Sequence, residues 1–259
     1  MSRPIRRFPL AVFAAWLLVC VGRPALADMV ATIERVKPSV VMVGIFNKLG
    51  SPQLTLRGTG FVVGDGRTVA TNAHVVAERN EQSEPGSIVV QVPGSPSDQR
   101  MRQAQVWVID QAHDLALLKI GGTPLPTLSL SDSDTVKEGQ SIAFMGFPIG
   151  GALGFSPVTH RGMVSAVTAI ALPSANAQQL KEAVIRRLKS GSFDVFQLDA
   201  TAYPGNSGGP MFDAETGGVV GIINMVLVKG TKEAILTHPS GISYAIPGNY
   251  LRALLTNAK

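Results

Sequence analysis

The chain has 259 residues, a formal net charge of +5 and a single cysteine. Its first 27 residues carry four of the 23 Lys and Arg side chains, none of the 18 acidic ones, and the cysteine, Cys20. Residues 28–259 therefore have a net charge of only +1, which excludes a broad basic surface of the kind that binds nucleic acids. This part of the chain cannot form an internal disulfide, but it is long enough to bury a hydrophobic core without one.

Residues 1–27 have the features of a secretory signal peptide. A basic start precedes an uncharged, mostly apolar stretch, Phe8–Gly22, and Ala25-Leu-Ala27 fits the small-x-small cleavage pattern. We expect a mature protein that begins near Asp28 and is periplasmic or secreted. The apolar stretch is shorter than the roughly 20 residues of a membrane span, so a stable membrane anchor is the less favoured alternative. The Arg6-Arg7 pair leaves twin-arginine and general export both open.

Residues 28–125 are predicted to form a first β-barrel. Apolar residues at helical spacing in Asp28–Val36, followed by Pro38, predict a short N-terminal helix. The segments after it are short, rich in β-branched residues and separated by Gly, Pro, Asp and Asn, as is typical of strands: 39–46, 58–63, 68–71, 87–92, 101–109 and 115–120.

Residues 126–259 are predicted to form a second β-barrel, after a connection at about 125–133. Its expected strands are 141–146, 159–167, 193–198, 209–212, 219–228 and 243–246, and Pro247–Leu255 is expected to form a short terminal helix. Strands that recur without intervening helices favour an all-β architecture over a parallel α/β sheet.

A glycine-rich segment, Asp199-Ala-Thr-Ala-Tyr-Pro-Gly-Asn-Ser-Gly-Gly-Pro-Met211, is the best candidate for a nucleophile loop. Glycine permits positive φ and lets backbone amides approach a ligand closely. A serine hydroxyl needs a base to remove its proton, and the oxyanion that it generates needs amide donors. We expect Ser207 to be the nucleophile and the N–H groups of Gly205 and Ser207 to form the oxyanion hole.

Two upstream segments supply the remaining groups of a catalytic triad. His74 interrupts the apolar run 69–76, and Asp114 opens the strand-like run 114–120. We expect the imidazole of His74 to take the proton of Ser207, and the carboxylate of Asp114 to orient the ring. His113 is not expected to contact its neighbour Asp114, because adjacent residues of a strand point to opposite faces.

Five motifs follow one another as in one protease family: Asn72-Ala-His-Val-Val, Asp114-Leu-Ala-Leu-Leu, Gly146-Phe-Pro-Ile-Gly, Gly205-Asn-Ser-Gly-Gly and Gly241-Ile-Ser-Tyr-Ala-Ile-Pro. Over residues 28–255 the chain resembles the HtrA/Deg family of trypsin-like serine proteases. The resemblance implies two six-stranded antiparallel β-barrels of chymotrypsin type, and unfolded or damaged exported proteins as substrates. Because four residues follow Leu255, we expect a protease domain without a PDZ domain.

The same resemblance locates a specificity pocket. It implies Thr201 at the base of the pocket, Asn224, Met225 and Val226 on a wall that pairs with the substrate backbone, and Gly241 and Ser243 on the far side. An uncharged base and the bulk of Val226 predict a preference for small or medium aliphatic side chains at P1, the residue before the cleaved bond.

Two other functions are compatible with parts of the sequence. Gly205-Asn-Ser-Gly-Gly209 also fits the G-x-S-x-G pattern of α/β-hydrolases, with Asp213 and His238 later in the chain, but that assignment leaves His74 unexplained. A protease-like chaperone or binding protein with little turnover is the remaining alternative. No His, Cys and acidic cluster has metal-ligand spacing, so neither a metal nor a cofactor is expected.

Three further expectations concern control and assembly. Residues 168–193 depart from the compact family pattern and predict an amphipathic helix near 177–190, which is either packing or a regulatory lid. We expect a resting state in which the amide of Gly205 is turned away from the oxyanion hole. A homotrimer could form through Met29, Ile33 and Phe46, although these residues could equally cover their own barrel.

Overall fold

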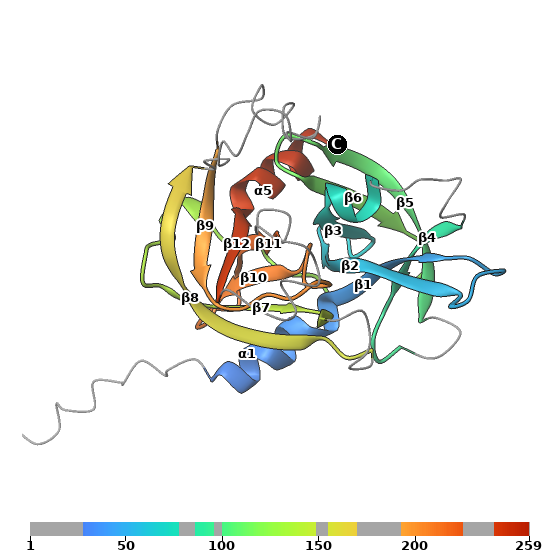
Figure 1. The fold of residues 1–259 in the computed structure, drawn as a ribbon, viewed down its shortest axis with the longest axis horizontal. Helices are drawn as coiled ribbons and strands as arrows, with labels where there is room; N and C mark the ends of the chain where they lie inside the picture. Colours follow the sequence, from blue (N-terminus) through green and yellow to red (C-terminus); the bar gives the residue numbers. More distant parts are fainter. Residues whose placement is uncertain are drawn as a thin grey trace, which may run out of the picture.

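In the computed structural model, two closed antiparallel barrels of six strands each lie side by side (Figure 1). The structure describes residues 28–77, 86–95, 100–148, 155–169, 193–224 and 241–258. The expected fold class is confirmed. The helix predicted near 177–190 lies outside the described residues.

The first barrel has the strand order β1-β2-β3-β6-β5-β4. Its strands are β1 (Val40–Phe46), β2 (Leu54–Val63), β3 (Thr68–Asn72), β4 (Ser87–Gln91), β5 (Met101–Asp110) and β6 (Leu115–Ile120). The second barrel has the order β10-β11-β12-β9-β8-β7. Its strands are β7 (Ser141–Gly146), β8 (Val158–Ala169), β9 (Asp194–Asp199), β10 (Pro210–Asp213), β11 (Val219–Ile223) and β12 (Ile242–Pro247).

Unbroken apolar runs form strands here because both of their faces are buried. In β6, Leu115 and Leu117 point into a core that contains residues of both barrels, whereas Ala116 and Leu118 point into the interior of the first barrel. A strand alternates its side chains between two faces, so a strand between two cores reads as continuously hydrophobic. The second barrel has its own core, which includes Ile142, Phe144, Val164, Phe196, Leu198, Met211 and Ile223.

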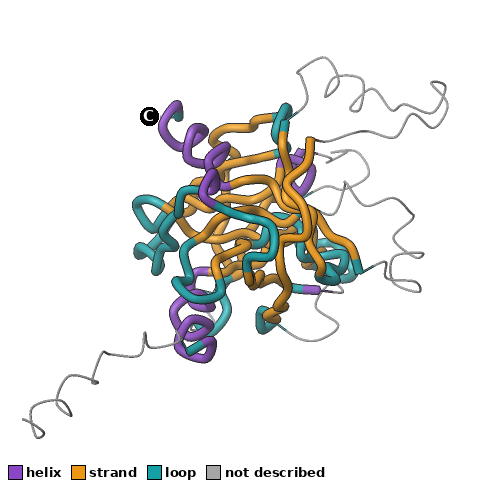
Figure 2. Tube along the Cα trace, turned by 90° about the vertical axis from the view of Figure 1, so that its left-hand side faces the viewer, coloured by secondary structure: helices purple, strands orange, loops and turns teal. Residues whose placement is uncertain are grey.

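Short helices pack on the core shared by the two barrels. Helix α1 (Met29–Val36) and helix α5 (Gly248–Asn257) lie at opposite ends of the molecule in both views (Figures 1 and 2). Met29 and Ile33 of α1 pack on this core, so they cover their own chain in part, and the trimer stays a prediction. Two 3₁₀ turns, η2 (Lys37–Ser39) and η3 (Ser133–Thr135), adjoin these helices, and no helix among the described residues is long and apolar enough to cross a membrane.

One helix was not anticipated from the sequence. Helix α2 (Ala73–Ala77) follows β3 directly and carries His74. The backbone amide of Ala73 donates to the carbonyl of Asp114 at 3.0 Å, a contact between positions that are 41 residues apart and invisible to local patterns. The segment that connects the two barrels forms backbone hydrogen bonds with both of them. Leu128 N–H donates to Val62 O of the first barrel at 2.9 Å, and Ser131 N–H donates to Val219 O of the second barrel at 2.8 Å.

Candidate active site

Asp114 is the most heavily bonded residue of the site. It is 4% exposed and has a φ of +55°, which is uncommon for a residue other than glycine. One carboxylate oxygen accepts the backbone N–H of His74 at 2.9 Å, and the other lies 2.7 Å from His74 Nδ1. Its carbonyl also accepts from the Asn72 side chain at 3.0 Å. The strained turn before β6 thus positions both the start of α2 and the imidazole that α2 carries.

Asn224 donates a further hydrogen bond to this carboxylate. Its side-chain amide, 1% exposed, donates to Asp114 Oδ2 at 2.8 Å, and its backbone amide donates to Tyr244 O at 2.9 Å. We expected Asn224 on the wall that faces substrate, but the structure directs its side chain inward to the carboxylate. A carboxylate with several charge-assisted hydrogen bonds stays ionised, as an orienter of histidine must.

Removing the Asn224 amide tests this support. We expect Asn224→Ala to lower kcat about 10-fold, because a hydrogen bond to a charged group contributes about 1.5 kcal/mol or more. Asn224→Asp should be worse at neutral pH, since a second carboxylate beside Asp114 favours uptake of a proton by the pair. Steady-state kinetics of both variants check this, and a kcat for Asn224→Asp equal to or above that of Asn224→Ala would refute it.

Ser207 belongs to the second barrel but lies against the first. Its carbonyl accepts the backbone N–H of Thr59 in β2 at 2.8 Å, and the residue itself is buried. A Cβ atom on Gly58 would lie 2.8 Å from both Ser207 O and the side chain of Val75, the residue after His74. The loop therefore reaches α2 only because β2 has a glycine at this point.

Gly208 explains how closely the loop approaches. It has a φ of +85°, and a Cβ atom there would lie 2.2 Å from Thr59 O and 2.3 Å from Thr71 Oγ1. Its amide donates to Ile223 O at 2.9 Å, which ties the loop back to β11. The structure thus brings the loop of Ser207 to the face of the first barrel that carries His74 and Asp114.

The loop before Ser207 is fixed by a buried threonine. The Thr59 hydroxyl donates to Gly205 O at 2.6 Å and accepts the backbone N–H of Phe147 at 3.1 Å. Gly205 has a φ of +104°, a conformation that glycine adopts without strain. Among the described residues its amide donates to no acceptor, so it is available to a ligand. The resting state that turns this amide away stays a prediction.

The expected pocket residues lie together where they are described. Thr201 follows β9, and Ala200 N–H donates to Gly241 O at 3.1 Å. Ser243, 1% exposed, donates to Ala200 O and accepts from Ala202 N–H, both at 2.8 Å, so its hydroxyl braces this loop from behind. Met225 and Val226 lie outside the described residues.

One apolar residue at this end of the barrel was not among the site residues expected from the sequence. Ile242 is 44% exposed, and it lies between Gly241 and Ser243 at the start of β12. An exposed large apolar side chain next to the candidate pocket is a candidate for contact with substrate. The signal was present in the motif Gly241-Ile-Ser, where Ile242 is the only bulky side chain.

His113 forms a second Asp–His pair beside the first. Its Nδ1 lies 2.6 Å from Asp110 Oδ2, and its ring stacks on Tyr250 of α5 with centroids 4.1 Å apart. The ring of Phe193 contacts it edge-on at 4.8 Å. The predicted reason for keeping His113 and Asp114 apart was wrong, because both residues lie in the turn before β6 and not in a strand; the His113 ring pairs with Asp110 instead. It anchors the turn that presents Asp114.

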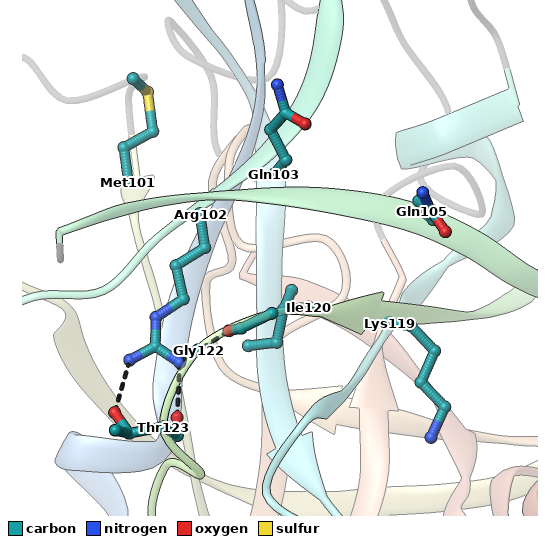
Figure 3. Close-up of a pocket in the computed structure, with 9 residues that line it drawn as sticks. Met101, Arg102, Gln103, Gln105, Lys119, Ile120, Gly122 and Thr123 are labelled. Atoms are coloured by element: carbon teal, nitrogen blue, oxygen red, sulfur yellow. Dashed lines mark hydrogen bonds between the residues drawn. The ribbon is translucent and has the colours of Figure 1, made fainter.

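A cavity of about 700 Å³ lies away from these residues (Figure 3). It is lined by the first half of β5, by the end of β6 and by the residues that follow β6, whereas Asp114 precedes the start of β6. Arg102 donates hydrogen bonds there to Gly121 O at 3.1 Å and to Thr123 O at 2.7 Å. Lys119 is paired with Asp65 at 3.1 Å. Because the two cationic side chains that line this cavity, Arg102 and Lys119, already have partners, we do not assign the active site to it on the basis of its size.

Comparisons with known proteins identify the family of this chain. Residues 58–222 match the trypsin-like peptidase domain family. The chain belongs to this family. It is HtrA-like: it is 33% identical over 191 residues to a probable periplasmic serine endoprotease DegP-like of Pseudomonas putida and 30% identical over 231 residues to the mitochondrial serine protease HTRA2 of Bos taurus.

The chain spans only about a third to two fifths of the length of these two relatives. The alignments cover 73% and 86% of this chain, but only 32% and 41% of those two relatives. Among solved structures, a variant of the HtrA-type protease AlgW with a tripeptide matches with a TM-score of 0.62 and 25% identity, over 88% of this chain and 62% of that one. AlgW with a decapeptide matches with a TM-score of 0.63 at 23% identity, which supports the fold.

Proposed function

We propose that this protein is an exported serine endopeptidase that cleaves unfolded or damaged proteins through an acyl-enzyme. The observation that carries the proposal is the buried carboxylate of Asp114, 2.7 Å from His74 Nδ1, with the loop of Ser207 docked against the same face. Family membership supports the reaction class. The periplasmic relative and the AlgW structures with peptides support the proposed compartment and substrates, and residues 1–27 supply the export signal.

The proposed reaction follows from the roles of these groups. Ser207 Oγ attacks the carbonyl carbon of the scissile bond, and His74 Nε2 takes the hydroxyl proton while Asp114 stabilises the resulting imidazolium. The amides of Gly205 and Ser207 bind the oxyanion. His74 then gives its proton to the leaving amine, which breaks the peptide bond and leaves an ester on Ser207. Water, deprotonated by His74, hydrolyses this ester and releases the carboxylic acid product.

The described part of the pocket predicts the specificity. The side chains at its base and far side carry no charge, and Ile242 adds apolar surface. A cationic side chain would lose its hydration there without gaining a partner. We therefore propose small or medium aliphatic residues at P1.

A matched peptide series tests both activity and specificity. Peptides that differ only at P1 should be cleaved with kcat/KM values for Val or Ala about 100-fold above those for Arg or Lys, since pockets of this kind discriminate by about 1–3 kcal/mol. The same protein should degrade casein faster than a tightly folded protein of similar size. Preferred cleavage after Arg or Lys would overturn the specificity, and an absence of any Ser207-dependent cleavage would overturn the function.

A further inference from the structure

His160 in β8 lies against the loop that holds the proposed oxyanion donors. Its Nε2 is 3.4 Å from the side-chain nitrogen of Asn206, the residue between Gly205 and Ser207. We infer that His160 is a positioning residue, which fixes the Asn206 side chain and through it the Asn206–Ser207 peptide unit, which carries one of the two proposed oxyanion-hole amides. The inference rests on the proposed function and assigns this histidine a part in it.

Asn206 has few other ways to be held. It is fully buried, and its side-chain oxygen has no hydrogen-bond partner among the described residues. A Cβ atom on Gly146 would lie 2.7 Å from that oxygen, so the end of β7 closes one side of the carboxamide. His160 is therefore its hydrogen-bonding contact on the other side. Burying a carboxamide with a single weak partner is costly, which indicates that its orientation matters.

The backbone of Asn206 transmits this orientation to the site. Its amide donates to Tyr203 O and its carbonyl accepts from Gly209 N–H, both at 2.9 Å. These bonds close two consecutive turns, 203–206 and 206–209, which share Asn206. Without its side-chain contact, Asn206 would be free to change its backbone torsions, and the peptide unit that follows it carries the Ser207 amide. An oxyanion hole depends on donors that are already in place before the reaction.

The ring of His160 is itself held firmly. It stacks on Phe144 of β7 with centroids 4.8 Å apart and planes 15° apart, as expected from their direct pairing between the two strands. Tyr203 is the titratable side chain that faces it, at 6.1 Å between ring centroids. No charged side chain forms an ion pair with His160 among the described residues, and its neighbour Arg161 is exposed.

The protonation state follows from these surroundings. Burial lowers the pKa of His160 below its usual value of 6.5, so the ring is neutral at neutral pH. With its one proton on Nδ1, the ring offers the Nε2 lone pair to the N–H of Asn206. A second proton would remove this acceptor and place two donors against each other. Activity should therefore need both His74 and His160 in the neutral form.

Substitutions separate this role from simple packing. His160→Phe keeps a ring to stack on Phe144 but has no acceptor. We expect kcat to fall about 10- to 100-fold with little change in KM, less than the about 10²- to 10³-fold cost of removing an oxyanion-hole donor outright. His160→Gln restores an acceptor near the Nε2 position and should recover most of the loss. Arg161→Gln, on the exposed face of the same strand, is the control and should leave kcat unchanged.

The pH profile gives a readout that packing would not move. On the acid side, log kcat/KM of the native protein should fall more steeply with pH than that of His160→Gln, because protonation of His160 adds to the loss in the native protein alone. Circular dichroism at each pH confirms that the protein remains folded. Equal slopes in the native protein and in His160→Gln, or a normal kcat in a folded His160→Phe variant, would overturn the inference.

A measurement without catalysis keeps the two proposals distinct. In the Ser207→Ala protein, ¹⁵N NMR at neutral pH should show His160 protonated on Nδ1 and unprotonated on Nε2. A proton on Nε2 would overturn the inference whatever the enzyme does. Conversely, if the native protein shows no Ser207-dependent hydrolysis while the NMR result holds, the proposed function fails and the contact itself stands.

Discussion

Ser207→Ala is expected to lower kcat about 10⁶-fold, the largest effect of any single substitution in this protein. The loss follows from the chemistry, because without Oγ no ester can form and hydrolysis must proceed by direct attack of water in the same pocket. KM should change little, since the side chain is small and the loop is held by backbone bonds to Thr59 and Ile223. Single-turnover and steady-state assays on one peptide measure both quantities.

A second serine provides the matched control. Ser165 lies on β8, and its hydroxyl bonds to Gln197 O at 3.0 Å. Ser165→Ala removes the same atom from the same barrel and should leave kcat within about 3-fold, as surface substitutions usually cost 0.5 kcal/mol or less. A Ser207→Ala protein that retains the native rate after repeated purification would show that another group is the nucleophile.

Asp114→Asn is expected to lower kcat about 10⁴-fold, by misplacing a proton rather than by removing the nucleophile. One oxygen of Asp114 receives both the Asn224 amide and the His74 ring, and the other receives the His74 backbone amide. A carboxamide has only one acceptor oxygen, so its NH₂ group must face a donor. The ring then changes tautomer, and Nε2 can no longer accept the proton of Ser207.

The neighbouring Asp–His pair serves as its control. Asp110→Asn makes the same chemical change four residues away, where the carboxylate accepts from the amides of Ala112 and His113 as well as from the His113 ring. We expect kcat to stay within about 10-fold, because the effect is limited to a weakened turn. Equal losses in the two variants would mean that Asp114 acts by holding the turn and not by orienting His74.

Local patterns were enough to predict the strands and the triad candidates. Short β-branched segments separated by Gly, Pro, Asp and Asn predicted nearly all the strand positions, although β2 starts at Leu54 and β8 extends to Ala169, beyond the expected bounds. Helix α2 was missed because its first bond runs from Ala73 to Asp114. A five-residue apolar segment does not distinguish a helix from a strand by its periodicity.

The support around the triad could not be predicted from spacing. Asn224 is 110 residues from Asp114, Thr59 is 146 residues from Gly205, and His160 is 46 residues from Asn206. Each is a common residue with no motif around it, and its role depends on which strands the barrels place side by side. The sequence placed Asn224 near the site through the order of the motifs, but it could not show where the side chain points.

The close contacts of three glycines could not be predicted from the sequence either. Gly58, Gly146 and Gly208 each leave room for a group from another segment, with contacts under 3.0 Å for any added Cβ atom. Their positions in motifs indicated that the backbone approaches something closely, but not what it approaches. The proposals for Met225, Val226 and the helix near 177–190 depend on residues outside the described part of the chain, so they remain sequence-based predictions.

The most direct test of the central claim is covalent labelling of the mature protein with a fluorophosphonate, followed by peptide mapping by mass spectrometry. The account predicts one adduct per chain, on Ser207, which forms slowly in His74→Ala and not at all in Ser207→Ala. A folded protein that takes up no label under conditions in which it cleaves peptides, or that carries the label on a different residue, would contradict the assignment of Ser207 as the activated nucleophile.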